Sequence, residues 1–408
     1  MICLIEALRY RCLKYIKKEL GNFHILVGPN ASGKSTFLDV ISFLGDLVKE
    51  GPESAIMKRT PNYNDLIWLK EDKSFELVIE INIPDRYERK GNCRYEVAIG
   101  KFPETKEFGI LSETMWFKPQ EKSERRQLQL FPSPQQQPGH IVVSGMRRNW
   151  KKVVNKVKGG NDNFYAETKG FDHAFKLGPQ KSALGNLPED ENKFPVATWL
   201  KRTLINGIQT LMLNSEMMRK PSPPGMPRNF RPDGSNLPWV IERLCTEYPE
   251  KFNDWLDHLR TALPELGNIK TILREEDKHR YIVLKYKNNL EVPSWMISDG
   301  TLRMLALTII AYLPDVEGTL LIEEPENGIH PKAMETVFQS LSSVYNAQVL
   351  IATHSPVIIS AAQIGTILCF AKSAEGATDV IDGSEHPNLK EWKGETPLDI
   401  LFASGVLG

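Results

Sequence analysis

The sequence predicts an α/β protein with a phosphate-binding loop, and three stretches support this prediction. The apolar stretch FHILVG runs directly into the loop GPNASGKST, residues 28–36, and the apolar helical pattern KSTFLDVISFLGDLV overlaps the end of this loop. A second apolar stretch, TLLIEE, ends in two glutamates, and a third, QVLIATHS, ends in a histidine and a serine. Strand and helix patterns alternate around these stretches, so we expect a sheet flanked by helices.

The other elements follow from periodicity along the chain. Residues 2–20 have the alternation of a β-hairpin, and residues 75–145, through FELVIEI, CRYEVAI and HIVVSG, predict an antiparallel sheet that is half exposed. Apolar residues at helical spacing predict helices over 196–211 and 237–263. Further helical patterns begin at Ser298 and after the strand with the two glutamates, and TILCF predicts a last strand.

We expect four regions along the chain. Residues 1–60 and 286–408 are the two parts of one nucleotide-binding domain. Between them, residues 61–160 form an antiparallel β lobe and residues 161–285 form a helical insert. The length of 408 residues agrees with two or three lobes, because domains typically contain about 100–200 residues.

The amino-acid composition is typical of a globular protein. Lys plus Arg (51) balance Asp plus Glu (51), so binding of nucleic acid would need a local basic patch. The five cysteines are scattered without a C-x-x-C pair, which is typical of reduced thiols. No apolar run reaches the length of about 18 residues that a bilayer requires, and the N-terminus has no signal-peptide pattern. We therefore expect a cytoplasmic protein without a membrane partner.

The glycine loop predicts a site for a nucleoside triphosphate with Mg²⁺. Gly28 and Gly33 let backbone N–H groups surround phosphates, and the following helix N-terminus adds its partial positive charge. Lys34 reaches the β and γ phosphates, and the Ser35 hydroxyl is a ligand of Mg²⁺. The expected contacts are Asn30, Ala31, Ser32, Gly33, Lys34, Ser35 and Thr36. A glycine-rich turn without a ligand is the alternative, but all four motif positions and both flanking elements agree with the nucleotide site.

The two glutamates predict the acidic part of the same site. Glu323 would hold the hydration shell of Mg²⁺, and Glu324 would polarise the attacking water as general base. Two acids at a strand end are usually a solvated terminus. The glycine loop favours the catalytic interpretation, because Mg·ATP needs an acid of this kind.

Two further motifs have a structural and a functional interpretation. Ser298 begins the helical segment SDGTLRMLALTI; it is either an N-cap or, together with the Gly300 amide and the helix dipole, a second phosphate site for a nucleotide on another subunit. His354 follows an apolar strand and precedes a proline. It is either a structural histidine or a residue that faces the γ-phosphate.

These four elements, in this order and with a large insert after the first, resemble the ABC-type ATPases of the RecF, SMC and OLD group. The resemblance covers residues 1–50 and about 290–372. It implies a P-loop NTPase fold: an ABC-type ATPase head with an antiparallel β lobe and a helical insert between the Walker A loop and the signature motif. It also implies that the head hydrolyses ATP with Mg²⁺, and that two heads hold ATP between them.

The resemblance also implies roles for individual residues. Ser298 and Gly300 would be the signature that one head supplies to the other, and residues 326–330 the D-loop contact. His354 would be the switch histidine, and Arg11, in RYRC, lies where the family often has an arginine that approaches the phosphates. Two features depart from the family. Glu323 replaces the usual aspartate, as in the EEPE version of the OLD-like subgroup, and no glutamine occurs between the Walker A loop and Gln120.

Two functions from different classes remain open. The first is an ATP-gated homodimer or higher homo-oligomer that controls a separately encoded effector protein. Family resemblance suggests bacterial anti-phage defence as the setting and a TOPRIM-like nuclease as one such effector. We expect no nuclease in this chain, because the short segment after His354 has no convincing D-x-D. The alternative is a RecF-like DNA-repair ATPase, for which the basic residues 147–158 are either a DNA contact or a solvated face. The neutral net charge and the absence of long heptads favour the first function.

Overall fold

The computed structural model describes residues 1–102, 107–119, 137–143, 145–390, 398 and 400. The chain divides into two compact units, each made of three segments. Unit 1 contains Met1–Gly21, Asn30–Ile208 and Phe370–Val380, and unit 2 contains Asn22–Pro29, Gln209–Cys369 and Ile381–Gly408. The chain therefore passes from unit 2 to unit 1 within the glycine loop, between Pro29 and Asn30.

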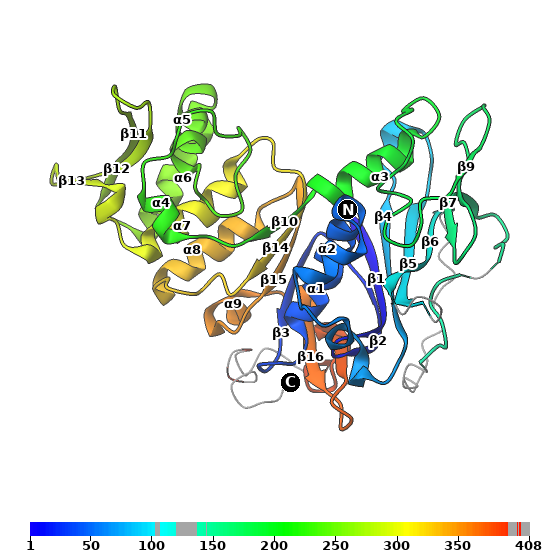
Figure 1. The fold of residues 1–408 in the computed structure, drawn as a ribbon. Helices are drawn as coiled ribbons and strands as arrows, with labels where there is room; N and C mark the ends of the chain where they lie inside the picture. The colour runs from blue at the N-terminus through cyan, green and yellow to red at the C-terminus, as the bar shows by residue number, and fades with distance from the viewer. Residues whose placement is uncertain (103–106, 120–136, 144, 391–397, 399, 401–408) are drawn as a thin grey trace. The chain divides into compact units, whose positions relative to one another are not determined.

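Unit 1 contains an eight-stranded sheet with the order β2-β1-β4-β5-β6-β7-β8-β9 (Figure 1). Each neighbouring pair is antiparallel. The strands are β1 (Ile2–Tyr10), β2 (Leu13–Glu19), β4 (Ser74–Asn82), β5 (Asn92–Lys101), β6 (Phe108–Lys118), β7 (Lys151–Val157), β8 (Asp162–Phe164) and β9 (His173–Phe175). The sheet thus extends on both sides of the expected β lobe at 61–160, because the N-terminal hairpin joins it through β1 and β4.

The predicted strand HIVVSG is not a strand in the part of the chain that the structure describes. Its backbone N–H groups donate instead to carboxylates of the sheet: Ile141 N lies 2.6 Å from Glu76 Oε2, and Val143 N lies 2.9 Å from Glu96 Oε2. Arg94 Nη2 also donates to the Ile141 carbonyl, at 3.1 Å. The prediction was wrong because buried side chains, rather than a neighbouring strand, bind this backbone.

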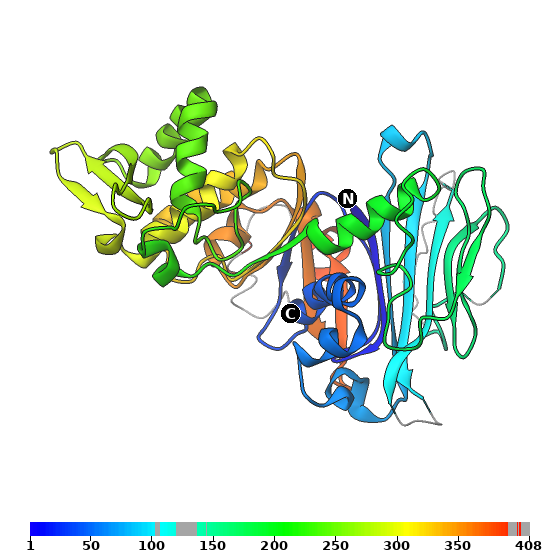
Figure 2. The same cartoon turned by 45° about the horizontal axis from the view of Figure 1, so that its top comes forward.

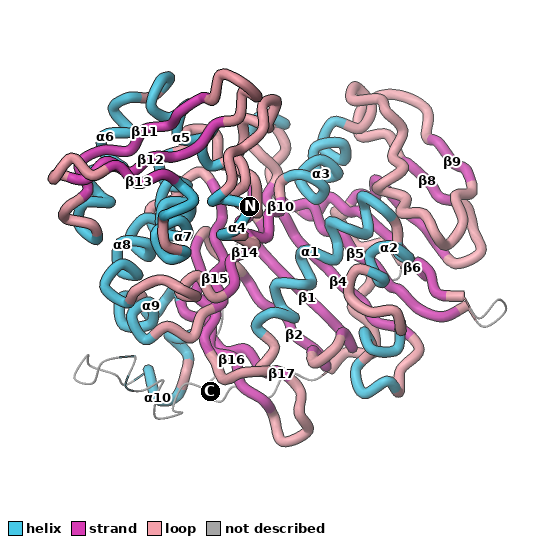
Figure 3. Tube along the Cα trace, turned by 60° about the vertical axis from the view of Figure 1, so that its left-hand side comes forward, coloured by secondary structure: helices cyan, strands magenta, loops and turns pink. Residues whose placement is uncertain are grey.

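One long helix, α1 (Lys34–Glu50), crosses the eight-stranded sheet (Figure 3). Phe43 of α1 packs edge-on against Phe75 of β4, with 5.6 Å between ring centroids. Gly45 lets helix α3 (Pro195–Asn206) approach closely, since a Cβ there would lie 2.6 Å from the Leu204 carbonyl oxygen. The other helices of unit 1 are α2 (Pro52–Met57), α3 (Pro195–Asn206), and the 3-10 turns η1 (Tyr63–Leu66), η2 (Trp68–Lys70) and η3 (Asp85–Tyr87).

A second, six-stranded sheet has the order β10-β14-β15-β3-β16-β17, and its strands β3, β14 and β15 belong to unit 2. The pairs β14 with β15, β15 with β3, and β3 with β16 are parallel. The strands are β3 (Phe23–Val27), β10 (Ile208–Leu211), β14 (Gly318–Glu323), β15 (Ala347–Ala352), β16 (Ile367–Lys372) and β17 (Thr378–Asp382). Buried parallel strands explain why FHILV, TLLI and AQVLIA are nearly continuous apolar runs.

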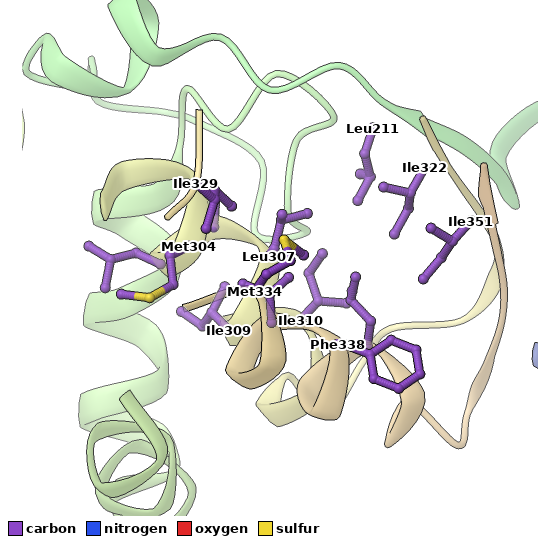
Figure 4. Packing of buried hydrophobic residues seen from close by; sticks show 14 of the residues in the cluster. Leu211, Met304, Leu307, Ile309, Ile310, Ile322, Ile329, Met334, Phe338 and Ile351 are labelled. Atoms are coloured by element: carbon purple, nitrogen blue, oxygen red, sulfur yellow. The ribbon is translucent and has the colours of Figure 1, made fainter. Parts of the chain in front are cut away.

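Helices α7 (Asp299–Ile309) and α8 (Pro331–Ser342) pack against these strands and bury the core of unit 2 (Figure 4). Leu307 and Phe338 are among the core residues contributed by the helices, and Ile322 and Ile351 are among those contributed by the strands. The helices are α4 (Ser215–Arg219), α5 (Leu237–Glu247), α6 (Pro249–Ala262), α7 (Asp299–Ile309), α8 (Pro331–Ser342), α9 (Pro356–Ala361), α10 (Pro387–Lys390), and the 3-10 turns η4 (Ser294–Met296), η5 (Ile310–Tyr312), η6 (Ile364–Thr366) and η7 (Gly383–Glu385).

Helices α5 and α6 lie beside a third sheet, formed by β11 (Leu266–Leu273), β12 (Arg280–Tyr286) and β13 (Glu291–Pro293) (Figure 2). The region 161–285, expected to be helical, therefore also contains strands β8 to β12. Within the described residues, no helix combines the length and the apolar character needed to cross a membrane.

Candidate nucleotide-binding site

The phosphate-binding loop connects β3 to α1 through a backbone with several left-handed positions. Gly28, Ala31 and Gly33 have φ angles of 152°, 60° and 107°. The glycines adopt these angles without strain, whereas Ala31 incurs a cost of about 1–2 kcal/mol. Helix α1 then begins at Lys34 with Gly33 as N-cap. An N-cap without a side chain leaves the first N–H groups of the helix to backbone partners or to a ligand.

Two side chains of the loop fit an anionic ligand. The Ser32 hydroxyl is buried and has no hydrogen-bond partner among the described residues, so it is available to a ligand or a water molecule. Lys34, the first residue of α1, is only 7% exposed. Ser35 is exposed at the first turn of α1. These features agree with a loop that surrounds phosphates.

Three parallel strands of unit 2 have their carboxyl ends aligned at the same edge of the sheet. Ala352 of β15 is paired with Glu323 of β14 on one side and with Leu26 of β3 on the other. Beyond these pairs, the Glu324 N–H donates to the Ala352 carbonyl at 2.8 Å, and the Thr353 N–H donates to the Leu26 carbonyl at 3.2 Å. The two glutamates and the segment before His354 therefore lie at the sheet edge from which β3 enters the loop.

Glu324 is exposed in a strained backbone conformation just after β14. Its φ angle is +46°, which is unusual for a residue with a Cβ and typical of functional sites. Asn327 Nδ2 donates to Glu324 Oε2 at 2.6 Å, which fixes the direction of the carboxylate. Glu323 is also exposed. Both carboxylates are thus open to solvent at the strand end.

Glu326 links the turn after β14 to the end of β15. Its Oε1 accepts hydrogen bonds from Thr353 Oγ1 at 2.8 Å and from the His354 N–H at 2.7 Å. Its Oε2 is buried and has no partner among the residues that the structure describes. The Glu326 carboxylate therefore holds the backbone of His354 within its own chain, and the D-loop role that the resemblance implies for residues 326–330 stays a prediction.

Ser298 has the geometry of an N-cap. Its Oγ accepts a hydrogen bond from the Thr301 N–H at 3.2 Å at the start of α7, and its side chain is exposed. Gly300 lies against the turn after β14, because a Cβ there would be 2.2 Å from the Gly328 carbonyl oxygen. The Ser298 side chain thus caps α7, its contact with a nucleotide on another chain stays a prediction, and the helix terminus that carries it is packed directly on the turn at Gly328.

Arg11 lies in unit 1 beside α1. Its Nη1 is 3.1 Å from Asp39 Oδ2, and the same carboxylate accepts from the Tyr10 hydroxyl at 2.6 Å and from Arg59 Nε at 2.6 Å. Burial, together with the Asp39 charge, raises the pKa of Tyr10 well above its ordinary value, so its hydroxyl remains a donor. The next residue, Cys12, donates through Sγ to Thr36 Oγ1 at 3.3 Å. Arg11 is thus adjacent to the start of α1, with its charge paired to Asp39.

The basic stretch at residues 147–158 is mostly the strand β7, and several of its lysines have partners inside unit 1. Lys156 forms a buried ion pair with Asp162 at 2.6 Å, and Lys151 Nζ donates to the Ala166 carbonyl at 2.9 Å. Lys151 and Lys156 are thus held by internal contacts, whereas Arg147 and Arg148 are exposed.

Mg²⁺ would need few protein ligands at this site. In nucleotide sites it is typically held by one or two side chains together with phosphates and water; Ser35 of unit 1 and Glu323 of unit 2 stay the predicted pair. Across the described ranges, no group of three or more His, Cys, Asp and Glu side chains forms a preassembled metal site. A Q-loop glutamine is not assigned, since no glutamine occurs between the phosphate-binding loop and Gln120.

Two contacts at this site were not predicted from the sequence. Asn327 orients Glu324 from the same tight turn, and the sequence signal for it is the short spacing in EEPENG. Thr378 donates from Oγ1 to the Ser32 carbonyl at 2.8 Å, across 346 residues of sequence. No local pattern could indicate a contact of that separation.

Comparison with known proteins identifies the fold and the family. An Smc head bound to the C-winged helix domain of ScpA is similar, with a TM-score of 0.54 and 14% identity over 93% of this chain and 97% of that one. An Smc head from Pyrococcus furiosus, with an extended coiled coil and bound to the C-terminal domain of ScpA, is also similar. Its TM-score is 0.50, with 13% identity over 93% of this chain and 95% of that one. The fold is therefore the α/β fold of SMC-like ATPase heads. Residues 23–360 match one family model, and the chain belongs to that family, described as "AAA domain, putative AbiEii toxin, Type IV TA system".

Proposed function

We propose that this chain binds and hydrolyses ATP. The observation that carries the proposal is the alignment of three strand ends, because it brings Glu323, Glu324 and the segment before His354 to the edge where β3 enters the phosphate-binding loop. In parallel α/β sheets, ligands bind at the carboxyl ends of the strands. Membership of an AAA-domain family and the similarity to SMC heads support the same activity.

Each residue of the proposed site has one task. The loop N–H groups and Lys34 hold the phosphates, and Ser35 and Glu323 hold Mg²⁺. Bound Mg²⁺ supplies positive charge that offsets the charge developing on the phosphates. Glu324, exposed and directed by Asn327, accepts a proton from the attacking water. His354, whose backbone is held by Glu326, contacts the γ-phosphate.

We further propose that the active form is a homodimer or a higher homo-oligomer. Ser298 and Gly300 of one chain would complete the nucleotide site of another. Two observations support this step. The Ser298 hydroxyl is exposed at the N-terminus of α7, where a helix dipole favours an anion. Gly300 packs on the turn at Gly328, so the proposed signature and the proposed D-loop lie side by side, where one partner chain could contact both.

The ATPase cycle, in this proposal, gates a separately encoded effector in bacterial anti-phage defence, and a TOPRIM-like nuclease is one candidate. The family description names a toxin of a toxin–antitoxin system, and the similar Smc heads each bind a separate protein, ScpA. Direct action on DNA is the second candidate, although the internal contacts of Lys151 and Lys156 do not favour it. Purification from the native host, followed by identification of any bound protein or DNA, distinguishes the two.

Glu324→Gln and Lys34→Ala test the activity itself. Glu324→Gln removes the base but keeps the phosphate loop, so hydrolysis should fall by about 10²–10⁴-fold while Mg·ATP still binds. Lys34→Ala should lose binding in calorimetry. Glu317→Gln, an exposed glutamate before β14, is the matched control and should resemble the wild type. Near wild-type hydrolysis by Glu324→Gln, or unchanged affinity of Lys34→Ala, would contradict the assignment.

A further inference from the structure

The phosphate-binding loop has a contact from the far end of the chain. Thr378, the first residue of β17, is 4% exposed. Its hydroxyl donates to the Ser32 carbonyl at 2.8 Å. The Ser32 carbonyl and the Gly33 N–H belong to the same planar peptide unit. A side chain that donates to this carbonyl therefore also fixes the direction of the Gly33 N–H. Thr378 therefore acts on the part of the loop that would face phosphates.

Thr378 also fills the space behind Gly33. A Cβ on Gly33 would lie 2.2 Å from Thr378 Oγ1 and 2.9 Å from its Cγ2, so the two residues are packed as closely as a glycine allows. Gly33 has a φ angle of 107°, which L-residues with a side chain rarely adopt. The loop conformation is thus fixed by its own glycine and by the threonine packed against it.

The backbone of the same threonine is anchored to the N-terminal hairpin. The Thr378 N–H donates to the Cys12 carbonyl at 2.9 Å, and Cys12 Sγ donates to Thr36 Oγ1 at 3.3 Å. Cys12 and Thr378, joined by one hydrogen bond, therefore contact both ends of the segment Ser32–Thr36. All of these residues belong to unit 1.

We propose that Thr378 is a positioning residue for ATP binding: its hydroxyl holds the Ser32 carbonyl, and its packing on Gly33 keeps the loop in the form that binds phosphates. This inference rests on the proposed ATP-binding function. Thr378 does not touch the nucleotide itself. If the loop spends part of the time in another form, its apparent affinity for ATP falls in proportion to the fraction of molecules that keep the binding form. Thr378 therefore sets the affinity for ATP rather than the rate of the chemical step.

Thr378→Val is the informative change, because valine keeps the shape of threonine and the backbone bond to Cys12 and removes only the hydroxyl. The affinity for Mg·ATP should fall about three- to tenfold, the effect of one hydrogen bond. KM for ATP should rise by the same factor, and kcat should stay within about twofold. Thr378→Ser keeps the hydroxyl and should bind nearly as the wild type does.

Two controls separate positioning from general stability. Thr246→Val also removes a hydroxyl that donates to a backbone carbonyl, that of Glu242 at 2.8 Å, but within α5; it should leave ATP binding unchanged. A variant that only lost folded protein would lower kcat and leave KM as it was. If Thr378→Val does not fold, Thr378→Ala and Thr378→Ser give the same comparison, since they differ in the hydroxyl.

The outcomes also distinguish this inference from the proposed function. Wild-type affinity in Thr378→Val, or equal losses in Thr378→Val and Thr378→Ser, would overturn the positioning role. If Lys34→Ala bound ATP as tightly as the wild type, the ATP site itself would be wrong, whatever the result at Thr378.

Discussion

Replacement of Glu326 by alanine tests the link between the turn after β14 and the switch segment. The Glu326 carboxylate is the acceptor for the Thr353 hydroxyl and for the His354 N–H. Alanine removes this acceptor and leaves both donors where they are. Thr353 is 0% exposed, so water cannot readily replace the lost bond. We expect lower stability and, in the folded protein, a displaced His354 with reduced hydrolysis of ATP.

The expected size follows from the two bonds. A buried donor left without an acceptor costs about 1–3 kcal/mol, so about 2–6 kcal/mol is the upper range for both, since the His354 N–H is only partly buried. The loss should lie in the lower half of that range, at about 2–3 kcal/mol, because Glu326 Oε2 is buried without a partner among the described residues and its removal recovers desolvation energy. Glu326→Gln keeps a carbonyl acceptor, so its free energy of unfolding should fall by less than about 1 kcal/mol.

Urea unfolding and ATPase rates measure both effects. Glu335→Ala, an exposed glutamate on α8, is the matched control and should change the free energy of unfolding by no more than about 0.5 kcal/mol. If Glu326→Ala were as stable as this control, the hydrogen bonds to Thr353 and His354 would contribute nothing to the free energy of unfolding. If Glu326→Gln were as damaging as Glu326→Ala, the charge rather than the acceptor would be responsible.

Two other changes test backbone geometry. Ala31→Gly should raise the free energy of unfolding by up to about 1 kcal/mol, because relief of the left-handed strain at φ 60° exceeds the added entropy of the unfolded chain; a loss of more than 1 kcal/mol in urea unfolding would contradict this. Gly300→Ala should lose about 1–3 kcal/mol despite the better helix propensity of alanine, because its Cβ would meet the Gly328 carbonyl at 2.2 Å. Wild-type stability and ATPase activity in that variant would show that the helix and the turn separate freely.

Much of the candidate site was predictable because its signals are local. The strand, loop and helix around Lys34 lie within one short stretch of sequence. Glu324 and His354 each follow closely on the end of their own apolar strand. Their side chains follow buried parallel strands, which appear in the sequence as apolar runs. The parallel order of those strands then brings residues as distant in sequence as Leu26 and Ala352 to one edge of the sheet.

Other parts depend on contacts that no periodicity records. The apolar segment around Ile141 looks like a strand, but Glu76 and Glu96 bind its backbone from the face of the sheet. Arg11 was expected to approach phosphates, and its partner Asp39 has no distinguishing pattern in the helix. Each of these contacts joins a charged side chain to a distant segment, so only the three-dimensional structure identifies it.

The central claim is that the ATP site is completed by Ser298 of a second chain, and the ATPase rate of a mixture of two inactive variants tests it most directly. Ser298→Arg blocks the approach of a second chain, and Lys34→Ala empties its own loop. Ser298→Ala removes the cap without adding bulk, so it controls for the cap's contribution to stability of about 0.5–2 kcal/mol. A mixed dimer keeps one intact loop facing one intact Ser298. Partial recovery of ATPase activity in the mixture, absent from either variant alone, is the predicted result; wild-type hydrolysis by Ser298→Arg in a protein that stays monomeric with ATP would contradict the account.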